Sequence, residues 1–173
     1  MNKINLTSLE LKTFTEQDAL DYCQLNNINP LDINELDLSW NKLTDVSGIK
    51  LFKNLEELYL YNNNKIKNIS ILKNLIKLKI LSIVNCSINN ITVLKYLNKL
   101  ERIDLSKNEI KDISIIQYLT KLEYLDINYL KLESNQIKYI NSCKNLEFLI
   151  CGFSGFKDKS VILKKINENI ILE

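Results

Sequence analysis

Two aspartates, Asp104 and Asp126, are the residues of this sequence best placed to do chemistry. They lie 22 residues apart at the same position of a repeating unit, and we expect them on adjacent strands, about 4.8 Å apart. Two carboxylates at that distance could share a proton or hold a metal ion. Arg102 and Lys107 are predicted to lie close enough to compensate them, and the chain has no histidine, GxSxG motif or P-loop. We therefore expect a protein that is not an enzyme and needs no cofactor, with a carboxylate-dependent enzyme kept as an alternative.

The cysteines point to a reducing compartment. Cys23, Cys86, Cys143 and Cys151 form no CxxC pair, and without histidine they do not suggest a zinc site. Cys86 and Cys151 fall on apolar repeat positions, where a small buried thiol is expected rather than a disulfide. The opening MNKINLTSLELK lacks the apolar core of a signal peptide, and no stretch reaches the ~18 apolar residues of a membrane span. We expect a cytoplasmic protein without membrane contact.

A repeat of about 22 residues organises the elements that position these side chains. Its pattern is LxxLxLxxNxIxxIxxLxxL, with Ile or Val often replacing Leu. The central apolar residues, separated by 22, 23, 22, 22 and 24 residues, are Leu36, Leu58, Leu81, Ile103, Leu125 and Leu149. One repeat carries an extra residue in YNNNK, at 61–65.

The pattern predicts an α/β solenoid. The xxLxL stretch has the period of two of a short strand, so alternate side chains face the core and the solvent. Stacking such strands gives a curved parallel sheet on the concave side. The next stretch, such as Ile110, Ile113 and Ile116, advances by threes, which suits short 3₁₀ or extended crossovers on the convex side.

An asparagine follows most of the predicted strands. We expect its amide to turn inward and to satisfy turn N–H and C=O groups in neighbouring repeats. The residues concerned are Asn41, Asn63 or Asn64, and Asn108, with Cys86 in the same place in the third repeat.

The fifth repeat departs from this pattern. Leu130 stands where an asparagine is expected, and two extra residues lie between Leu132 and Ile137. We predict a locally broken ladder of amides and a longer, α-helical crossover around residues 133–142.

We expect a single domain over residues 1–173. Residues 1–32 form an N-terminal cap, with a first strand unit at Leu6, Leu9 and Leu11 and a helix that begins after Thr15, with Asp18 in a capping box, and ends near Leu25. Residues 33–156 carry the repeats, so that there are seven strand units in all. Residues 157–173 form a C-terminal cap with a short helix and a final strand over 169–172.

The 22-residue units with the crossovers DVSGI, NISIL, NITVL and DISII resemble the internalin-like and phosphatase-regulator-like subclass of leucine-rich-repeat proteins. The resemblance covers roughly residues 33–156. It implies a leucine-rich-repeat solenoid and binding of another protein on the concave face. We expect it to differ from the secreted internalins, because residues 1–12 do not resemble a signal peptide and no immunoglobulin-like pattern is seen after the repeats.

The exposed strand positions form columns across the concave face, and two properties distinguish them. Seven of the chain's fourteen aromatic residues fall in these columns, and aromatic side chains are frequent hot spots of protein interfaces. The columns also carry six acids, Glu10, Glu35, Asp37, Glu57, Asp104 and Asp126, against three bases, Lys12, Arg102 and Lys107. The predicted partner-binding residues are Glu35, Asp37, Trp40, Glu57, Tyr59, Tyr61, Arg102, Asp104, Tyr124, Asp126 and Tyr129.

This surface predicts a protein partner with a basic patch and an apolar anchor. Phe148 and Phe153 are left out because we expect the C-terminal cap to cover them in part. The chain could act as an inhibitor, an immunity-type protein or a regulator, and we expect it to be a monomer by itself. A nucleic-acid partner is not expected, because that would need clustered basic residues on one face. A self-associating scaffold that pairs through the sheet edges remains the second alternative.

Overall fold

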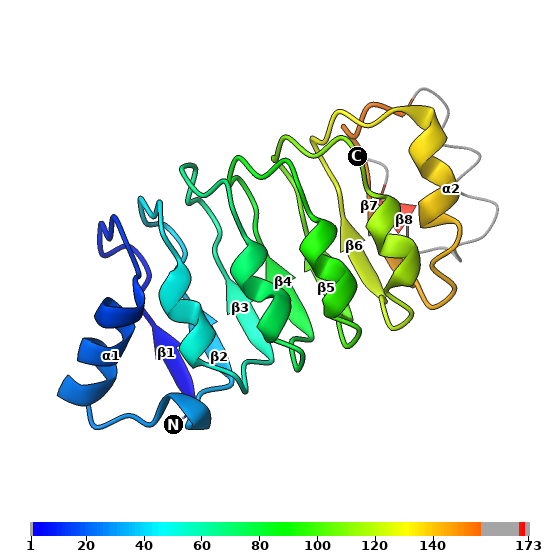
Figure 1. Cartoon of the computed structure of the whole chain (residues 1–173). Coiled ribbons are helices and arrows are strands. Elements are labelled where there is room, and N and C mark those ends of the chain that lie inside the picture. The colour runs from blue at the N-terminus through cyan, green and yellow to red at the C-terminus, as the bar shows by residue number, and fades with distance from the viewer. Residues whose placement is uncertain (1, 157–169, 172–173) are drawn as a thin grey trace.

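The structure is a computed structural model, which describes residues 2–156 and 170–171. In these residues, eight short parallel strands form one sheet in the order β1 to β8. The strands lie side by side in chain order, with helical turns along one face of the sheet (Figure 1). Their bounds are β1 Lys3–Asn5, β2 Glu35–Asp37, β3 Glu57–Tyr59, β4 Ile80–Ser82, β5 Arg102–Asp104, β6 Tyr124–Asp126, β7 Phe148–Ile150 and β8 Ile170–Ile171.

The central apolar residue of each repeat sets the register of the sheet. Leu36 lies opposite Leu58, and Leu58 opposite Leu81. From β2 to β7 these central residues are at most 1% exposed, because alternate strand positions point into the core. The predicted solenoid with a parallel sheet is confirmed.

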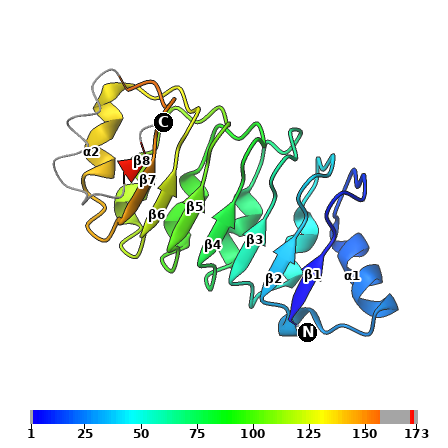
Figure 2. The same ribbon diagram turned by 180° about the vertical axis from the view of Figure 1, so that it is seen from behind.

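The crossovers on the opposite face are short 3₁₀ turns, as predicted. Regular repeats use η2 Ser47–Leu51, η3 Ser70–Asn74, η4 Thr92–Tyr96 and η5 Ser114–Tyr118, and a shorter turn, η1, spans Pro30–Asp32. An Asp or Asn lies two residues before the first residue of each regular turn, and its side chain accepts a hydrogen bond from the N–H of that first residue. In η5, for example, Asp112 Oδ1 accepts from Ser114 N at 2.8 Å. This bond explains the D/N-x-S/T signature of the crossovers. Figure 2 shows the same chain from the sheet side.

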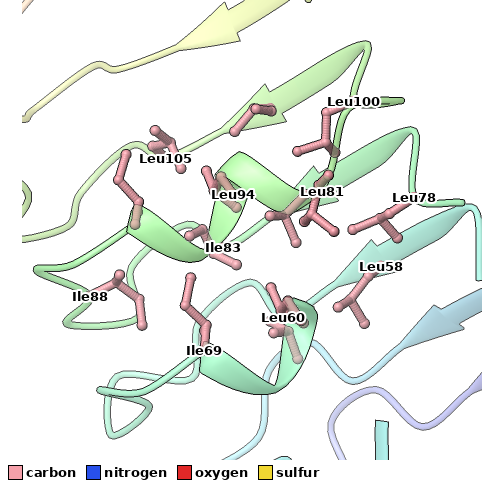
Figure 3. Packing of buried hydrophobic residues seen from close by; sticks show 14 of the residues in the cluster. Leu58, Leu60, Ile69, Leu78, Leu81, Ile83, Ile88, Leu94, Leu100 and Leu105 are labelled. Atoms are coloured by element: carbon pink, nitrogen blue, oxygen red, sulfur yellow. The ribbon is translucent and has the colours of Figure 1, made fainter. Parts of the chain in front are cut away.

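Equivalent apolar residues of successive repeats stack in the core. Figure 3 shows Leu60, Ile83 and Leu105 from three neighbouring repeats, and Leu78 and Leu100 from two. All five are fully buried. A repeat therefore completes its core only against its neighbours.

Buried amides form the predicted ladder. Asn63 Nδ2 donates to Leu60 O in its own repeat and to Leu38 O in the preceding one, at 2.9 and 3.0 Å. Its Oδ1 accepts from Leu43 N at 3.2 Å. Asn41 and Asn108 make equivalent bonds, so the ladder residue of the YNNNK repeat is Asn63 rather than Asn64.

Cys86 occupies the ladder position next to the repeat that carries the extra residue. Its thiol donates to Leu60 O at 3.0 Å, and burial raises its pKa to about 12. The preceding turn closes on itself, because Ile66 N donates to Asn63 O at 3.0 Å. This turn therefore needs no amide oxygen from position 86, and a small buried thiol is tolerated there.

The fifth repeat has the predicted irregular crossover. Leu130 is fully buried at the ladder position, and the crossover contains η6 Ser134–Gln136 followed by α2 Ile137–Ile140. The Gln136 side chain accepts from Ile113 N of the preceding repeat at 3.0 Å. The break in the amide ladder and the helical crossover are both confirmed.

The N-terminal helix is confirmed, but the predicted first strand is wrong. Helix α1 spans Glu16–Leu25, with Thr15 and Asp18 in a capping box. The first strand, however, contains Ile4, which lies opposite Leu36, whereas the expected unit was Leu6, Leu9 and Leu11. Asn41 Oδ1 accepts from Leu9 N and Leu11 N, which fixes that segment as a turn in which Leu9 is 54% exposed.

At the other end, β8 pairs with β7 through Ile170 and Ile171, within the predicted final strand over 169–172. Its flanking positions and the predicted helix of the C-terminal cap lie outside the described residues. No helix in the described part of the chain is long and apolar enough to cross a membrane.

Gly48 allows α1 to pack against the first regular crossover. In later repeats its position holds Ile71, Val93 and Ile115. A Cβ on Gly48 would lie 2.4 Å from Thr15 O and 2.9 Å from Ala19 Cβ. Gly48 N also donates to Phe14 O at 2.8 Å, so the helix cannot shift outward without losing this bond.

We predict that Gly48→Ala destabilises the protein by about 1–3 kcal/mol, because the new methyl group overpacks against backbone atoms. Thermal unfolding followed by circular dichroism measures this as a lowered Tm. Val93→Ala is the matched control, because Val93 is a half-buried residue at the same position of η4. A Gly48→Ala protein as stable as the parent would show that α1 does not pack as described.

Candidate functional site

The corrected register defines four columns on the concave face. The first strand position holds Lys3, Glu35, Glu57, Ile80, Arg102, Tyr124 and Phe148, and the third holds Asn5, Asp37, Tyr59, Ser82, Asp104, Asp126 and Ile150. Two further columns follow the strands, at Thr7, Ser39, Tyr61, Val84, Ser106, Asn128 and Gly152, and at Ser8, Trp40, Asn62, Asn85, Lys107, Tyr129 and Phe153. Glu10 and Lys12, predicted for this face, do not belong to it because β1 begins earlier. The face therefore carries five acids and three bases.

An acidic cluster, made of Glu35, Asp37 and Glu57, occupies β2 and β3. Glu35 and Glu57 are direct neighbours in the parallel ladder, a like-charge arrangement that costs stability. Lys3 forms an ion pair with Glu35, and the Tyr59 hydroxyl donates to Glu57 Oε2 at 2.7 Å. Burial, together with this hydrogen bond, raises the pKa of Tyr59, so the hydroxyl stays protonated and keeps donating.

Aromatic side chains stand beside this acidic cluster. Trp40 is 55% exposed, and its ring meets the Tyr61 ring edge-on, with 5.1 Å between the centroids. A hollow of about 650 Å³ adjoins Trp40, Tyr59 and Tyr61, with the small residues Ser82 and Ser106 also in its lining. The hollow forms where these large rings stand next to small residues.

The C-terminal half of the face combines aromatic and cationic groups. The Arg102 guanidinium lies 4.4 Å from the centroid of the Tyr124 ring, and Lys107 Nζ lies 5.4 Å from that of Tyr129. Such contacts hold the cations over the ring faces. The next repeat extends both rows, because Tyr124 lies 6.5 Å from Phe148 and Tyr129 stacks on Phe153 at 4.9 Å.

Phe148 and Phe153 also belong to this surface, although they are not among the predicted partner-binding residues. They are 40% and 62% exposed. Their positions in the columns could be read from the sequence, whereas the exposure of their rings could not. Most of the predicted site residues therefore lie in two clusters. One is the acidic cluster on β2 and β3, with Trp40, Tyr59 and Tyr61 beside it. The other is an aromatic cluster around β6, which contains Tyr124 and Tyr129.

Asp104 and Asp126 lie opposite each other on β5 and β6, as expected. Asp104 Oδ1 accepts from Ser106 N at 3.0 Å and from Ser106 Oγ at 2.7 Å, and Asp126 Oδ1 accepts from Asn128 N at 2.8 Å. These bonds close the turn after each strand, as Asp37 does with Ser39 N. The two aspartates therefore have a structural role, which is to close these turns.

Burial raises the pKa of Asp104. The pKa of Asp126 is raised to about 6, first by burial and then by the charge of Asp104, against the effect of its backbone hydrogen bond. Across the described residues, no three His, Cys, Asp or Glu side chains are grouped to hold a metal ion. Asp104 and Asp126 are therefore a pair of partly desolvated carboxylates.

Comparison with known proteins identifies the repeat. A family model described as Leucine Rich repeats (2 copies) matches residues 33–74. A comparison with curated proteins finds no match. Among solved structures, an internalin (inlF) from Listeria monocytogenes is 25% identical with a TM-score of 0.75, over 94% of this chain and 57% of that one.

Internalin C2 (inlC2) from the same organism is 24% identical with a TM-score of 0.75, over 98% of this chain and 78% of that one. The plant peptide hormone receptor RGFR1, solved in complex with RGF2, is 18% identical with a TM-score of 0.63, over 90% of this chain and 27% of that one. The chain spans little more than half the length of the inlF internalin.

We predict that Asp126→Asn stabilises the protein at pH 7 by about 1–2 kcal/mol, a value discounted for the solvent that reaches this half-buried group. The folded pKa of about 6 lies above the ordinary value of 3.8, so the folded state binds the proton more tightly. Parent stability should then fall as the pH rises from about 4 to 6. Urea unfolding at pH 4 and pH 7 measures both proteins, and equal differences at the two pH values would contradict the assignment.

Proposed function

Because the chain is a leucine-rich-repeat protein with an internalin-like fold, we propose that it binds another protein on its concave face. Proteins of this fold generally mediate protein–protein interaction. RGFR1 was solved in complex with RGF2. The proposed contact residues are the two clusters of the face and the aromatic residues next to them.

The observation that carries this proposal is the set of acids without basic partners on an aromatic surface. Of the five acids in the four columns, only Glu35 has a salt bridge within residues 2–156. Asp37, Glu57, Asp104 and Asp126 are partly buried and face outward from the sheet. Basic side chains of a partner would supply the missing charge.

The aromatic residues supply the apolar part of the contact. Rigid rings such as those of Trp40 and Tyr61 bury a large area and lose little conformational entropy. The partner therefore has a basic patch with an apolar group that enters the hollow beside Trp40, Tyr59 and Tyr61. An inhibitory or immunity-type role would be a specific form of this binding, and rescue of cells that express the partner would identify it.

We also propose a cytoplasmic location. Cys23, Cys86 and Cys151 are buried, as small apolar residues would be. A chain that uses cysteine in this way fits a reducing compartment.

We predict that Tyr59→Ala/Tyr61→Ala weakens binding of the partner at least tenfold, because two rings of the contact are lost. Proteins retained from a lysate of the native host by the immobilised parent chain are identified by mass spectrometry and purified. Their affinities for the parent and for the variant are then compared by calorimetry. Tyr96→Ala/Tyr118→Ala is the matched control, because these tyrosines are 51% and 63% exposed on the opposite face. A concave variant that binds as tightly as this control would refute the proposal.

Neutralising the acidic cluster tests the predicted charge of the partner. We expect Asp37→Asn/Glu57→Gln to lower the association rate constant several-fold at low salt, with a smaller effect at high salt. The exposed acids Glu123 and Glu147 lie outside the four columns, so Glu123→Gln/Glu147→Gln is the control. Surface plasmon resonance measures the rates, and a faster association of the concave variant would show that the partner is acidic.

A further inference from the structure

One column of the concave face has a backbone conformation that its residues do not favour. In six repeats its residue has φ between 53° and 60°, at Ser8, Trp40, Asn62, Asn85, Lys107 and Tyr129. From Trp40 onward, this residue directly precedes the ladder position, so the inward turn of the ladder imposes the conformation. Asparagine tolerates it best among residues with a Cβ, whereas a bulky aromatic residue is an outlier there.

Trp40 and Tyr129 gain little burial in return for this strain. They are 55% and 48% exposed. Each ring rests on an aromatic residue of the next repeat, Trp40 on Tyr61 and Tyr129 on Phe153. These contacts fix both rings at the surface without covering them, so fold stability alone does not explain two aromatic residues in this column.

The two rings are spaced along the face. They follow β2 and β6, which are four strands apart, or about 19 Å at ordinary strand spacing. Trp40 borders the hollow of about 650 Å³ on the concave face. Tyr129 borders a hollow of about 910 Å³ that is lined mainly by residues outside the four columns, such as Thr92 and Ser114 of the crossovers. Between Trp40 and Tyr129 this column holds the polar residues Asn62, Asn85 and Lys107. Asn85 Nδ2 donates to Asn62 Oδ1 at 2.6 Å.

We infer that Trp40 and Tyr129 are two anchors that together hold one partner protein and are kept against the backbone preference for asparagine. The inference rests on the proposed function and adds a spacing to it. The partner has two apolar contact sites about 19 Å apart, with basic side chains between them that face Asp37, Asp104 and Asp126. Rings that are fixed before binding lose little entropy when the partner docks.

Paired substitutions separate backbone strain from the loss of ring contacts. Trp40→Ala and Trp40→Asn both remove the ring, but only asparagine relieves the left-handed conformation. We expect the Asn variant to have the higher Tm by roughly 1–4 °C, and likewise for Tyr129→Asn over Tyr129→Ala. Tyr118 is 63% exposed and lies in η5, outside the strained column, so Tyr118→Asn should melt no higher than Tyr118→Ala. Asn variants of Trp40 and Tyr129 that melt no higher than the Ala variants would overturn the inference.

The same Asn variants test the anchors against the partner purified on the parent chain. Calorimetry should show at least tenfold weaker binding for Trp40→Asn and for Tyr129→Asn, a further loss for the double variant and no change for Tyr118→Asn. Parent-like binding by either single variant would overturn the inference. If Tyr59→Ala/Tyr61→Ala still loses binding in that case, the proposed function stands without these anchors. If two different proteins are captured and each depends on one ring, the single-partner inference is wrong.

Discussion

The buried amide ladder is the interaction on which the rest of the structure depends. Each strand has only three residues in β1 to β7, too few to set their own register against competing alignments. Asn41, Asn63 and Asn108 turn inward and bond to carbonyl groups in their own and the preceding repeat. They thereby fix where each turn begins and which side chains reach the concave face. The residue before the ladder position is left-handed in every one of these repeats, including Asn85 and Tyr129, where Cys86 and Leu130 replace the asparagine.

The repeats could be predicted because their apolar spacing has one physical solution. Strand positions, 3₁₀ crossovers, the amide ladder and its break at Leu130 all follow from side chains that must be buried or hydrogen-bonded in every unit. The predicted position of the first strand is wrong because LTSLEL, at residues 6–11, matches the LxxLxL spacing of the repeat. The strand that forms, β1, lies just before this segment. The choice between them depends on Asn41, whose amide oxygen accepts from Leu9 N and Leu11 N, 32 and 30 residues away. Such long-range bonds are not visible in the local pattern.

The composition of the concave face could be predicted from the register of the repeats, but the interactions that its individual residues make could not. Asp37, Asp104 and Asp126 each close the turn that follows their strand, so part of the acidity has a structural cause. Likewise, the sequence aligns Gly48 with Ile71, Val93 and Ile115 but does not show why this position needs a glycine. The reason is the close approach of α1, which comes from another part of the chain. The exposure of Phe148 and Phe153 and the strain at Trp40 and Tyr129 depend on how the repeats stack in the folded chain.

Trp40 is the single tryptophan of the chain and lies on the proposed contact surface, so it reports directly on the central claim. The chain labelled with fluorotryptophan has one fluorine signal, which can be followed by NMR while the purified partner is added. The account predicts that this signal shifts and loses its sensitivity to a soluble paramagnetic reagent as the complex forms. A complex that forms while the signal keeps its position and its full sensitivity would show that the partner binds away from the concave face.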